Sequence, residues 1–397
     1  MPWNNRSVIG ERRHLMLMLL QNKKSVRYWC RVFGISRKTA YKWKRRFLQG
    51  GRRALRDRSR RPRRMPRRLS GHQIKRIKYW RKKYPDWGPK KLRAKLPSRV
   101  GTPSLRTIAR WLKRLDLLAA RSRRPPKACL RRHRALTVAR RPNQVWTVDF
   151  KGWFRTGNGQ RCEPLTVRDL FSRYGLLVRL LPTQHWKPVQ AAFTRLFRVR
   201  GLPEIIRVDN GSPFASKGPA GLSRLSVWWT RLGIRVEFTR PGHPQDNGAH
   251  EQFHRVMKRR TISPAAWSPR GQQHRTTTFL EHYNWERPHE SLGQKCPGQL
   301  YRKSPRPFPA RLPAIIYPRA SQVRRVRSNG EIRWAGRKRF VGEAFVGQRV
   351  ALRALQRGVW SVYFTSILIG HLHQNDVGAM RPAVYKHRQP TQRNKKV

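Results

Sequence analysis

The stretch QVWTVDF, residues 144–150, is a run of β-branched and aromatic residues with one aspartate, Asp149, near its end. Val, Trp, Thr and Phe favour extended structure, so the run predicts a β-strand that reaches Asp149. The stretch EIIRVDNG, residues 204–211, repeats the pattern and predicts a buried strand followed by Asp209 and an Asn-Gly turn. Each aspartate alone could simply cap a turn, but two at strand ends favour a bound cation.

Strand and helix patterns alternate around these two segments. Further strands are expected at 163–171, 174–181 and 234–239, and helices at 187–201, 225–233 and 249–260. This mixed order predicts α/β layers around a central sheet, in a domain spanning 141–305.

The third helix of this set, in RPGHPQDNGAHEQFHRVMKRR (240–260), carries the single glutamate of the stretch, Glu251. At about 100° per residue, Glu251 lies opposite an expected apolar face and beside Arg255 and Lys258. Two interpretations stay open: a solvated i,i+4 salt bridge, or a metal ligand flanked by two phosphate-contacting cations. The expected apolar face consists of Ala249, Phe253, Val256 and Met257.

Charge indicates the partner. The chain has 92 Lys and Arg against 18 Asp and Glu, a net charge of +74, and 46 of these cations against four acids lie in residues 1–140. Phosphates relieve such self-repulsion, so nucleic acid is expected, with the first third as its main binding part. The charge is spread along the chain rather than gathered on one amphipathic face, and no 18-residue apolar run exists, so no membrane association is expected. Four widely spaced cysteines without a Cys-x-x-Cys pair indicate reduced thiols of a cytosol.

Residues 25–47 have helix-turn-helix spacing, with Ser25 and Ser36 as N-caps and a turn at Gly34. The second helix turns Ala40, Trp43 and Phe47 inward, as a DNA-reading helix requires. The alternative is a helical hairpin with a solvated basic face. The expected DNA-contacting residues are Arg37, Lys38, Tyr41 and Lys42.

The remaining segments complete a multidomain organisation. Beyond the α/β domain, short strands and an Asn329-Gly330 hairpin signal predict a small β-barrel or β-sheet domain. The expected order is a helix-turn-helix domain (1–50), a basic linker (51–68), a second helix-turn-helix-like domain (69–120), a basic linker (121–140), the α/β domain (141–305), the β domain (320–372) and a basic tail (377–397).

Four motifs together resemble bacterial insertion-sequence transposases whose catalytic core is similar to that of retroviral integrases. They are WTVDF, VDNGSPF, PGHPQDNGAHEQFHRVMKR and a downstream YNWERPH, and they span about residues 141–300. The resemblance implies a ribonuclease H-like fold with a D,D,E triad of Asp149, Asp209 and Glu251. The 42-residue separation of Asp209 and Glu251 is longer than in retroviral integrases, with the excess expected in 217–226, and no His-His-Cys-Cys module precedes the core.

The implied chemistry is phosphodiester cleavage and transfer with two Mg²⁺ or Mn²⁺ ions held by the triad. Asn210, Asn247, Arg255 and Lys258 are expected to position the DNA. A zinc site at His243, His250 and His254 is disfavoured because matching cysteines are missing.

The expected partners are double-stranded DNA, both element ends and target, and further copies of the chain in a homo-oligomer. The expected location is the bacterial cytoplasm, at the nucleoid. The rival functions are a catalytically inactive DNA-binding regulator and a ribonuclease H-like nuclease without strand transfer.

Overall fold

The computed structural model describes residues 7–59, 69–96, 101–118, 136–240 and 248–383. His243, Asn247 and most of the expected linkers and tail lie outside these residues. The chain forms two compact units, residues 1–70 and 71–397, and each is considered by itself.

The first unit is a three-helix domain whose helices begin at the predicted caps. The side-chain oxygens of Ser25 and Ser36 accept from the backbone N–H groups of Tyr28 and Thr39, and Gly34 has a positive φ of 59° at the turn. The helices are α1 (Val8–Leu20), α2 (Val26–Val32) and α3 (Arg37–Gly50). Their shared core consists of Leu15, Met16, Leu19, Cys30, Ala40, Trp43 and Leu55.

This domain continues past residue 50, where a linker was expected. Residues Gly51–Leu55 form a 3-10 helix, and Leu55 is fully buried. The buried guanidinium of Arg12 donates to the Leu55 carbonyl at 2.8 Å and to Asp57 at 2.9 Å. Composition suggested too few apolar residues to fold here, but one leucine and one ion pair hold the segment against α1.

The second unit begins with three helices, α4 (Gly71–Lys83), α5 (Pro89–Ala94) and α6 (Leu105–Arg114). Ser104 caps α6 by accepting from the Thr107 N–H, and Ile108 and Leu112 of this helix are buried. The end of α4 contacts the core through Asp86, whose carboxylate pairs with Arg260 at 3.0 Å and Arg287 at 2.7 Å.

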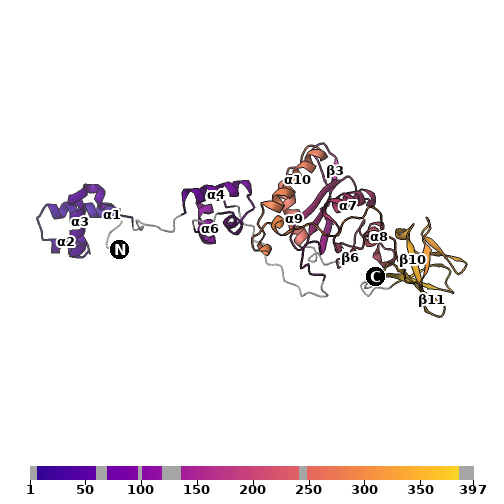
Figure 1. Cartoon of the computed structure of the whole chain (residues 1–397). Coiled ribbons are helices and arrows are strands. Elements are labelled where there is room, and N and C mark those ends of the chain that lie inside the picture. Colours follow the sequence, from indigo (N-terminus) through magenta and orange to yellow (C-terminus); the bar gives the residue numbers. More distant parts are fainter. Residues whose placement is uncertain (1–6, 60–68, 97–100, 119–135, 241–247, 384–397) are drawn as a thin grey trace, which may run out of the picture. The chain divides into compact units, whose positions relative to one another are not determined.

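The α/β domain has a central sheet in the order β2-β3-β1-β5-β6, and β4 also pairs with β3. Strands β3 and β6 of this sheet are labelled in Figure 1. Strands β1, β3 and β4 are antiparallel neighbours, whereas β1, β5 and β6 are parallel. The expected strands are all present; the short β2 was not anticipated. The strands are β1 (Val145–Phe150), β2 (Phe154–Arg155), β3 (Arg161–Asp169), β4 (Gly175–Leu181), β5 (Ile205–Val208) and β6 (Arg235–Phe238).

Alternation along the strands sends side chains to two helical layers. Trp146 and Val148 of β1 pack in one hydrophobic cluster with α7 (Trp186–Arg200) and α8 (Arg224–Arg231). On the other face, Val178 of β4 packs in a cluster with α9 (Gly248–Met257) and α10 (Pro269–Trp285). Thr147 and Asp149 therefore belong to the α9 face. A π-helical turn, Lys258–Ile262, extends α9, and α11 (Pro297–Leu300) follows α10.

Side-chain amides of α10 bond to the edge strand β4. The Gln273 amide accepts from Leu180 N at 2.9 Å and donates to Val178 O at 2.9 Å. The Asn284 amide accepts from Gly175 N at 2.8 Å and donates to Gly175 O at 2.9 Å. Gly175 is required there because a Cβ would lie 2.4 Å from Leu280.

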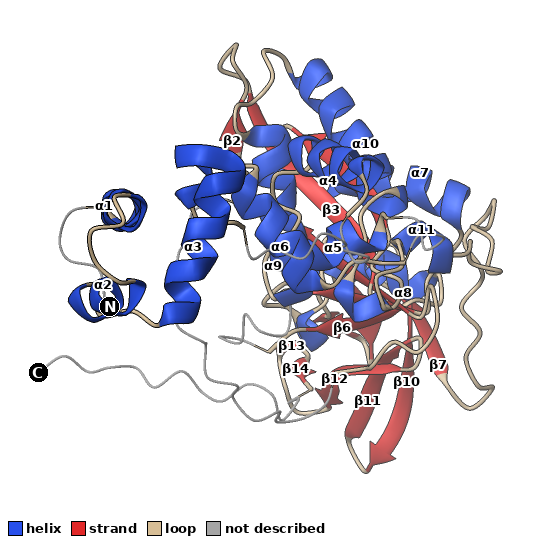
Figure 2. Cartoon of the chain, turned by 90° about the vertical axis from the view of Figure 1, so that its left-hand side faces the viewer, coloured by secondary structure: helices blue, strands red, loops and turns tan. Residues whose placement is uncertain are grey.

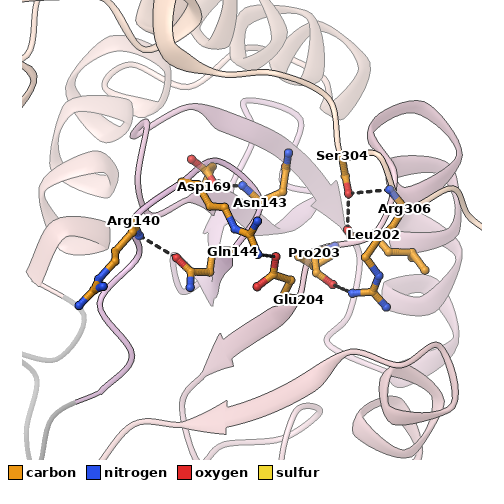
Figure 3. A network of polar contacts seen from close by, with 10 residues as sticks. Arg140, Asn143, Gln144, Asp169, Leu202, Pro203, Glu204, Ser304 and Arg306 are labelled. Carbon is orange, nitrogen blue, oxygen red and sulfur yellow. Dashed lines mark hydrogen bonds and ion pairs between the residues drawn. The ribbon is translucent and has the colours of Figure 1, made fainter.

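A polar network fixes the segment in front of β1 (Figure 3). Asn143 donates from its backbone N–H to the Asp169 carboxylate at 2.8 Å, which ties the start of β1 to the end of β3. Ser304 and Arg306, downstream of α11, donate to the carbonyls of Leu202 and Pro203 ahead of β5. The Glu204 and Ile205 N–H groups donate to the Asn143 and Gln144 carbonyls, each at 3.0 Å, which joins the start of β5 to the start of β1.

The C-terminal part is β-rich, with a five-stranded and a three-stranded sheet, and β10, β11 and β12 lie side by side in the larger one (Figure 2). The turn expected at Asn329-Gly330 is present, since the Gly330 N–H donates to the Arg327 carbonyl at 3.0 Å and the Arg327 N–H to the Glu331 carbonyl at 2.8 Å. The strands on either side nevertheless belong to different sheets, because β7 pairs with β10 and β8 pairs with β9. The strands are β7 (Gln322–Arg325), β8 (Glu331–Trp334), β9 (Arg337–Phe340), β10 (Arg349–Gln356), β11 (Val359–Phe364), β12 (Ile367–His373), β13 (Gly378–Ala379) and β14 (Arg381–Pro382).

The segment 217–226, where the extra length was expected, supports this β domain. It contains a 3-10 turn, Pro219–Gly221, and Leu222, which is buried in the hydrophobic cluster of the β sheets together with Val227 of α8. The additional residues thus pack between the sheet layer and the C-terminal strands rather than forming a free loop.

Candidate active site

Asp149 and Asp209 lie at the same edge of two adjacent parallel strands. Val145 is level with Ile205 and Thr147 with Arg207, so the same register continued places Asp149 level with Asp209. Neighbouring strands are about 4.8 Å apart, which brings both aspartates to one region at the carboxyl ends of β1 and β5.

Glu251 lies in the first turn of α9 and is exposed, as are Arg255 and Lys258. The pKa of Asp149 is raised to about 7, mainly by burial and in addition by the negative charges of Asp209 and Glu251. The Phe150 backbone N–H and Lys151 act in the opposite direction. The charges of the other two predicted carboxylates therefore reach Asp149 at this edge of the sheet.

Both polar side chains of the turn after β5, Asp209 and Asn210, form hydrogen bonds to the backbone. The Asp209 carboxylate accepts from Gly211 N at 3.2 Å, so the turn-capping role considered for it is present. Asn210 is exposed and donates from its amide to the Thr239 carbonyl at 2.6 Å, which joins the turn to the end of β6. A DNA-contacting role for Asn210 would have to coexist with this bond.

Among the residues that the structure describes, no group of three His, Cys, Asp or Glu side chains is placed closely enough to hold a metal ion. The donor chemistry nonetheless suits Mg²⁺ or Mn²⁺, because all three candidates are carboxylates and such ions prefer oxygen ligands.

The buried face of α9 differs from the expected one. His250 and His254 are buried with Phe253 and Met257, at i, i+3, i+4 and i+7, whereas Val256 is only half-buried. Burial lowers the pKa of His250 well below its usual value and that of His254 to about 3, so both imidazoles are neutral. Their helical spacing with Phe253 and Met257 could have identified them as buried, but from the sequence they were considered only as zinc ligands.

Both imidazoles bond to the sheet beneath α9. The Thr166 hydroxyl of β3 lies 2.5 Å from His250 Nε2 and 2.8 Å from His254 Nε2, and it donates to the Asp149 carbonyl at 2.9 Å. His250 Nδ1 is 3.0 Å from the Thr147 hydroxyl, and His254 Nδ1 is 3.8 Å from Asp149 Oδ2. None of these contacts was predicted from the sequence.

In the first unit, the four α3 residues expected to contact DNA are all exposed on one side of the helix. The opposite side holds buried Ala40 and Trp43. The four exposed residues are Arg37, Lys38, Tyr41 and Lys42.

Comparison with known families follows the same division of the chain. Residues 139–244 and 232–297 each match an integrase core domain, and residues 321–376 match the C-terminal domain of IS481 family transposases. Residues 11–63 match a helix-turn-helix domain and 39–112 a homeodomain-like domain. These matches imply a DNA-binding protein with N-terminal helix-turn-helix domains and an integrase core. Within the described residues, no helix has the length and apolar character needed to cross a bilayer.

Similar proteins come from bacterial insertion elements. A 31.7 kDa uncharacterized protein of element IS407 from Burkholderia multivorans is 26% identical over 187 residues, 47% of this chain and 65% of that protein. A 39.2 kDa uncharacterized protein of IS476 from Xanthomonas euvesicatoria is 27% identical over 46% of this chain and 51% of its own length. The transposase of IS904 from Lactococcus lactis is 27% identical over 39% of this chain and 60% of its own length. The matched region spans about half to two thirds of these curated relatives.

Among solved structures, the catalytic core domain of HTLV-2 integrase in complex with magnesium aligns with 42% of this chain and 100% of that chain. The identity is 16% and the TM-score 0.33. A likeness of this degree supports no conclusion about the present chain.

Proposed function

The chain is a relative of insertion-sequence transposases with an integrase-like core, and from this premise we propose that it binds the ends of its own mobile element, cleaves them and joins the 3′ ends to target DNA. The observation that carries the proposal is the level placement of Asp149 and Asp209 at the carboxyl ends of adjacent parallel strands, with Glu251 in the first turn of α9. No protein nucleophile is needed, because water or a 3′-OH attacks the phosphodiester.

Asp149, Asp209 and Glu251 would hold the divalent ions, two in each site. Bound Mg²⁺ or Mn²⁺ supplies activation of the attacking oxygen and charge stabilisation at the leaving one. The chain's own contribution is to hold its carboxylates on two rigid strands and one helix. The exposed cations Arg255 and Lys258, on the same helix as Glu251, would bind phosphates of the DNA end.

The proposed partners follow from the same division of roles. Helix α3 would recognise the terminal repeats, and Asn210 and Asn247 would contact the DNA near the triad. Joining two ends to target DNA requires two active sites, so we propose that the chain acts as a homo-oligomer on DNA in the bacterial cytoplasm, at the nucleoid.

The test is strand transfer of a labelled element end into plasmid DNA with Mg²⁺ or Mn²⁺, alongside end binding by the same preparations. Glu251→Gln, Asp149→Asn and Asp209→Asn each remove one negative charge at nearly constant size. We expect each variant to bind ends at least as well as the wild type, since repulsion of phosphates falls. Cleavage and transfer should drop by at least about a thousandfold in each, because metal-ion catalysis supplies several kcal/mol.

A matched control is Glu281→Gln, which removes one exposed carboxylate from α10. It should transfer at the wild-type rate. Near-normal transfer by one triad variant would exclude that residue as a ligand. A wild type that binds ends without metal-dependent chemistry would instead establish the inactive regulator, and cutting without joining would establish the nuclease.

A further inference from the structure

One hydroxyl, that of Thr166, stands at the centre of the contacts between α9 and the sheet. Thr166 is fully buried on β3, opposite Asp149 in the β1–β3 register. Its oxygen has three partners from two other elements: the Asp149 carbonyl of β1 and the Nε2 atoms of His250 and His254 on α9.

The direction of every bond in this network is determined by hydrogen count. A hydroxyl has one hydrogen and two lone pairs, and a carbonyl oxygen can only accept, so the Thr166 hydrogen goes to Asp149 O. Both Nε2 atoms must then donate to Thr166. Neutral His250 consequently accepts at Nδ1 from the Thr147 hydroxyl, and His254 presents an Nδ1 lone pair toward Asp149 Oδ2.

Apolar packing alone would not orient α9. Phe253 and Met257 pack with Val178, Phe279 and Tyr283, and such contacts tolerate small rotations of a helix. Two hydrogen bonds from positions i and i+4 to a single oxygen do not, since moving α9 relative to β3 stretches at least one of them. Glu251 is adjacent to His250 in the chain, and Asp149 carries the carbonyl that receives the Thr166 hydrogen.

We propose that Thr166, His250 and His254 are positioning residues that fix Glu251 of α9 relative to Asp149 of β1 through one shared hydroxyl oxygen. The proposal rests on the proposed function for its catalytic consequence. Misplacement of a reacting or coordinating group by about 1 Å costs on the order of a hundredfold in rate, so loss of the shared oxygen should affect chemistry far more than DNA binding.

A purely structural role is the competing interpretation, because buried polar groups need partners in any protein. Two pairs of variants separate the roles. Thr166→Ser keeps the hydroxyl and Thr166→Val replaces it with a methyl group of similar size. His254→Gln keeps an N–H near the Nε2 position, whereas His254→Met has similar length and no donor.

The control is Thr276→Val, on α10. Thr276 is also fully buried; its hydroxyl donates to the Gln273 carbonyl at 2.8 Å and accepts from the Gln273 side-chain amide at 3.3 Å, and both partners belong to α10. Two quantities are measured on full-length protein: strand transfer under single-turnover conditions, and Mn²⁺ affinity by calorimetry. Circular dichroism and end binding verify that each variant is folded.

We expect Thr166→Ser and His254→Gln to stay within about threefold of the wild type in both quantities. Thr166→Val and His254→Met should lose about a hundredfold in transfer and bind Mn²⁺ several-fold more weakly, while Thr276→Val changes neither. The proposal is overturned if folded Thr166→Val and His254→Met match their hydroxyl- and donor-retaining partners, or if Thr276→Val loses as much.

If Thr166→Val does not fold, the His254 pair decides alone. If the wild type shows no strand transfer, the proposed function fails, and Mn²⁺ affinity still separates the variants. Equal affinities within each pair would then reject the positioning role as well.

Discussion

Asp149 ionises at a cost to the folded chain. Its pKa rises from 3.8 to about 7, so the folded state favours the protonated carboxyl over a range in which the unfolded chain is already ionised. The resulting penalty is absent below about pH 4, grows as pH rises and is complete above about pH 7. Because one pKa unit corresponds to about 1.4 kcal/mol, the penalty is at most about 4 kcal/mol.

Asp149→Asn should therefore be more stable than the wild type at pH 8 in EDTA, by roughly 2–4 kcal/mol. The difference should shrink at pH 5. Urea unfolding followed by tryptophan fluorescence at both values checks this, with the exposed Glu281→Gln as the control. An equal difference at the two pH values would contradict a pKa origin.

At the level of single residues, the sequence identified what is chemically conspicuous. An aspartate at the end of an apolar strand is rare enough to be noticed, so Asp149 and Asp209 were named, and the β1–β5 register places them level. His250 and His254 were considered only as zinc ligands and disfavoured because cysteines are missing; their partners in the fold, Thr147 and Thr166, lie 103 and 88 residues away in the chain. No local pattern connects groups at such separations.

Helix α3 offers a test at the level of elements. Arg37, Lys38 and Lys42 are exposed on it, away from the buried Ala40 and Trp43. If α3 reads bases, replacing the three cations by alanine should reduce binding to the element end much more than binding to random DNA, since a good base contact is worth about 1–3 kcal/mol of discrimination.

The matched control removes three exposed cations of the same unit outside α3, namely Arg13, Lys23 and Lys24. It should weaken binding to both DNAs alike, through lost phosphate contacts. Competition binding with labelled end and random duplexes measures the ratio. An unchanged ratio for the α3 variant would show that this helix contacts only the backbone.

Helices and strands could be predicted where the signal lies within the segment itself. Capping serines fixed α2 and α3, and apolar runs fixed the strands of the core. The Asn329-Gly330 signal identified the turn but not the strand pairing, because a turn signal is local, whereas the choice of partner is not: β7 pairs with β10 and β8 with β9. The segment after residue 50 was assigned to a linker because its one anchor, Arg12, lies 43 residues earlier.

The whole molecule carries a net charge of +74, and its first unit has a hydrophobic core of its own. A fragment of residues 1–70 should therefore fold and bind element-end DNA without the rest of the chain. Its affinity should fall steeply between 50 and 200 mM salt, because each phosphate contact adds about −0.9 to the slope of log K against log salt. Fluorescence anisotropy across that range checks the slope, and a value near zero would refute electrostatic DNA binding by this unit.

The composition predicted nucleic acid as the partner, but it did not predict which of the few acidic residues form ion pairs within the protein. Asp86, Glu286 and Glu290 pair with cations across the contact between the α4–α5 region and the helices that follow α9. Charge totals cannot distinguish a carboxylate that joins two segments from one that binds metal. That distinction needed the fold.

The amides of Gln273 and Asn284 have a consequence for solubility and assembly. Edge strands invite strands of other molecules to add to them, which leads to sheet-extended aggregates. On β4 these two side chains already occupy backbone groups of Gly175, Val178 and Leu180, and α10 lies over the edge. A second copy is therefore prevented from docking its own strand on β4, and copies that gather on DNA must meet through other surfaces, which keeps a concentrated protein–DNA assembly from becoming a continuous intermolecular sheet.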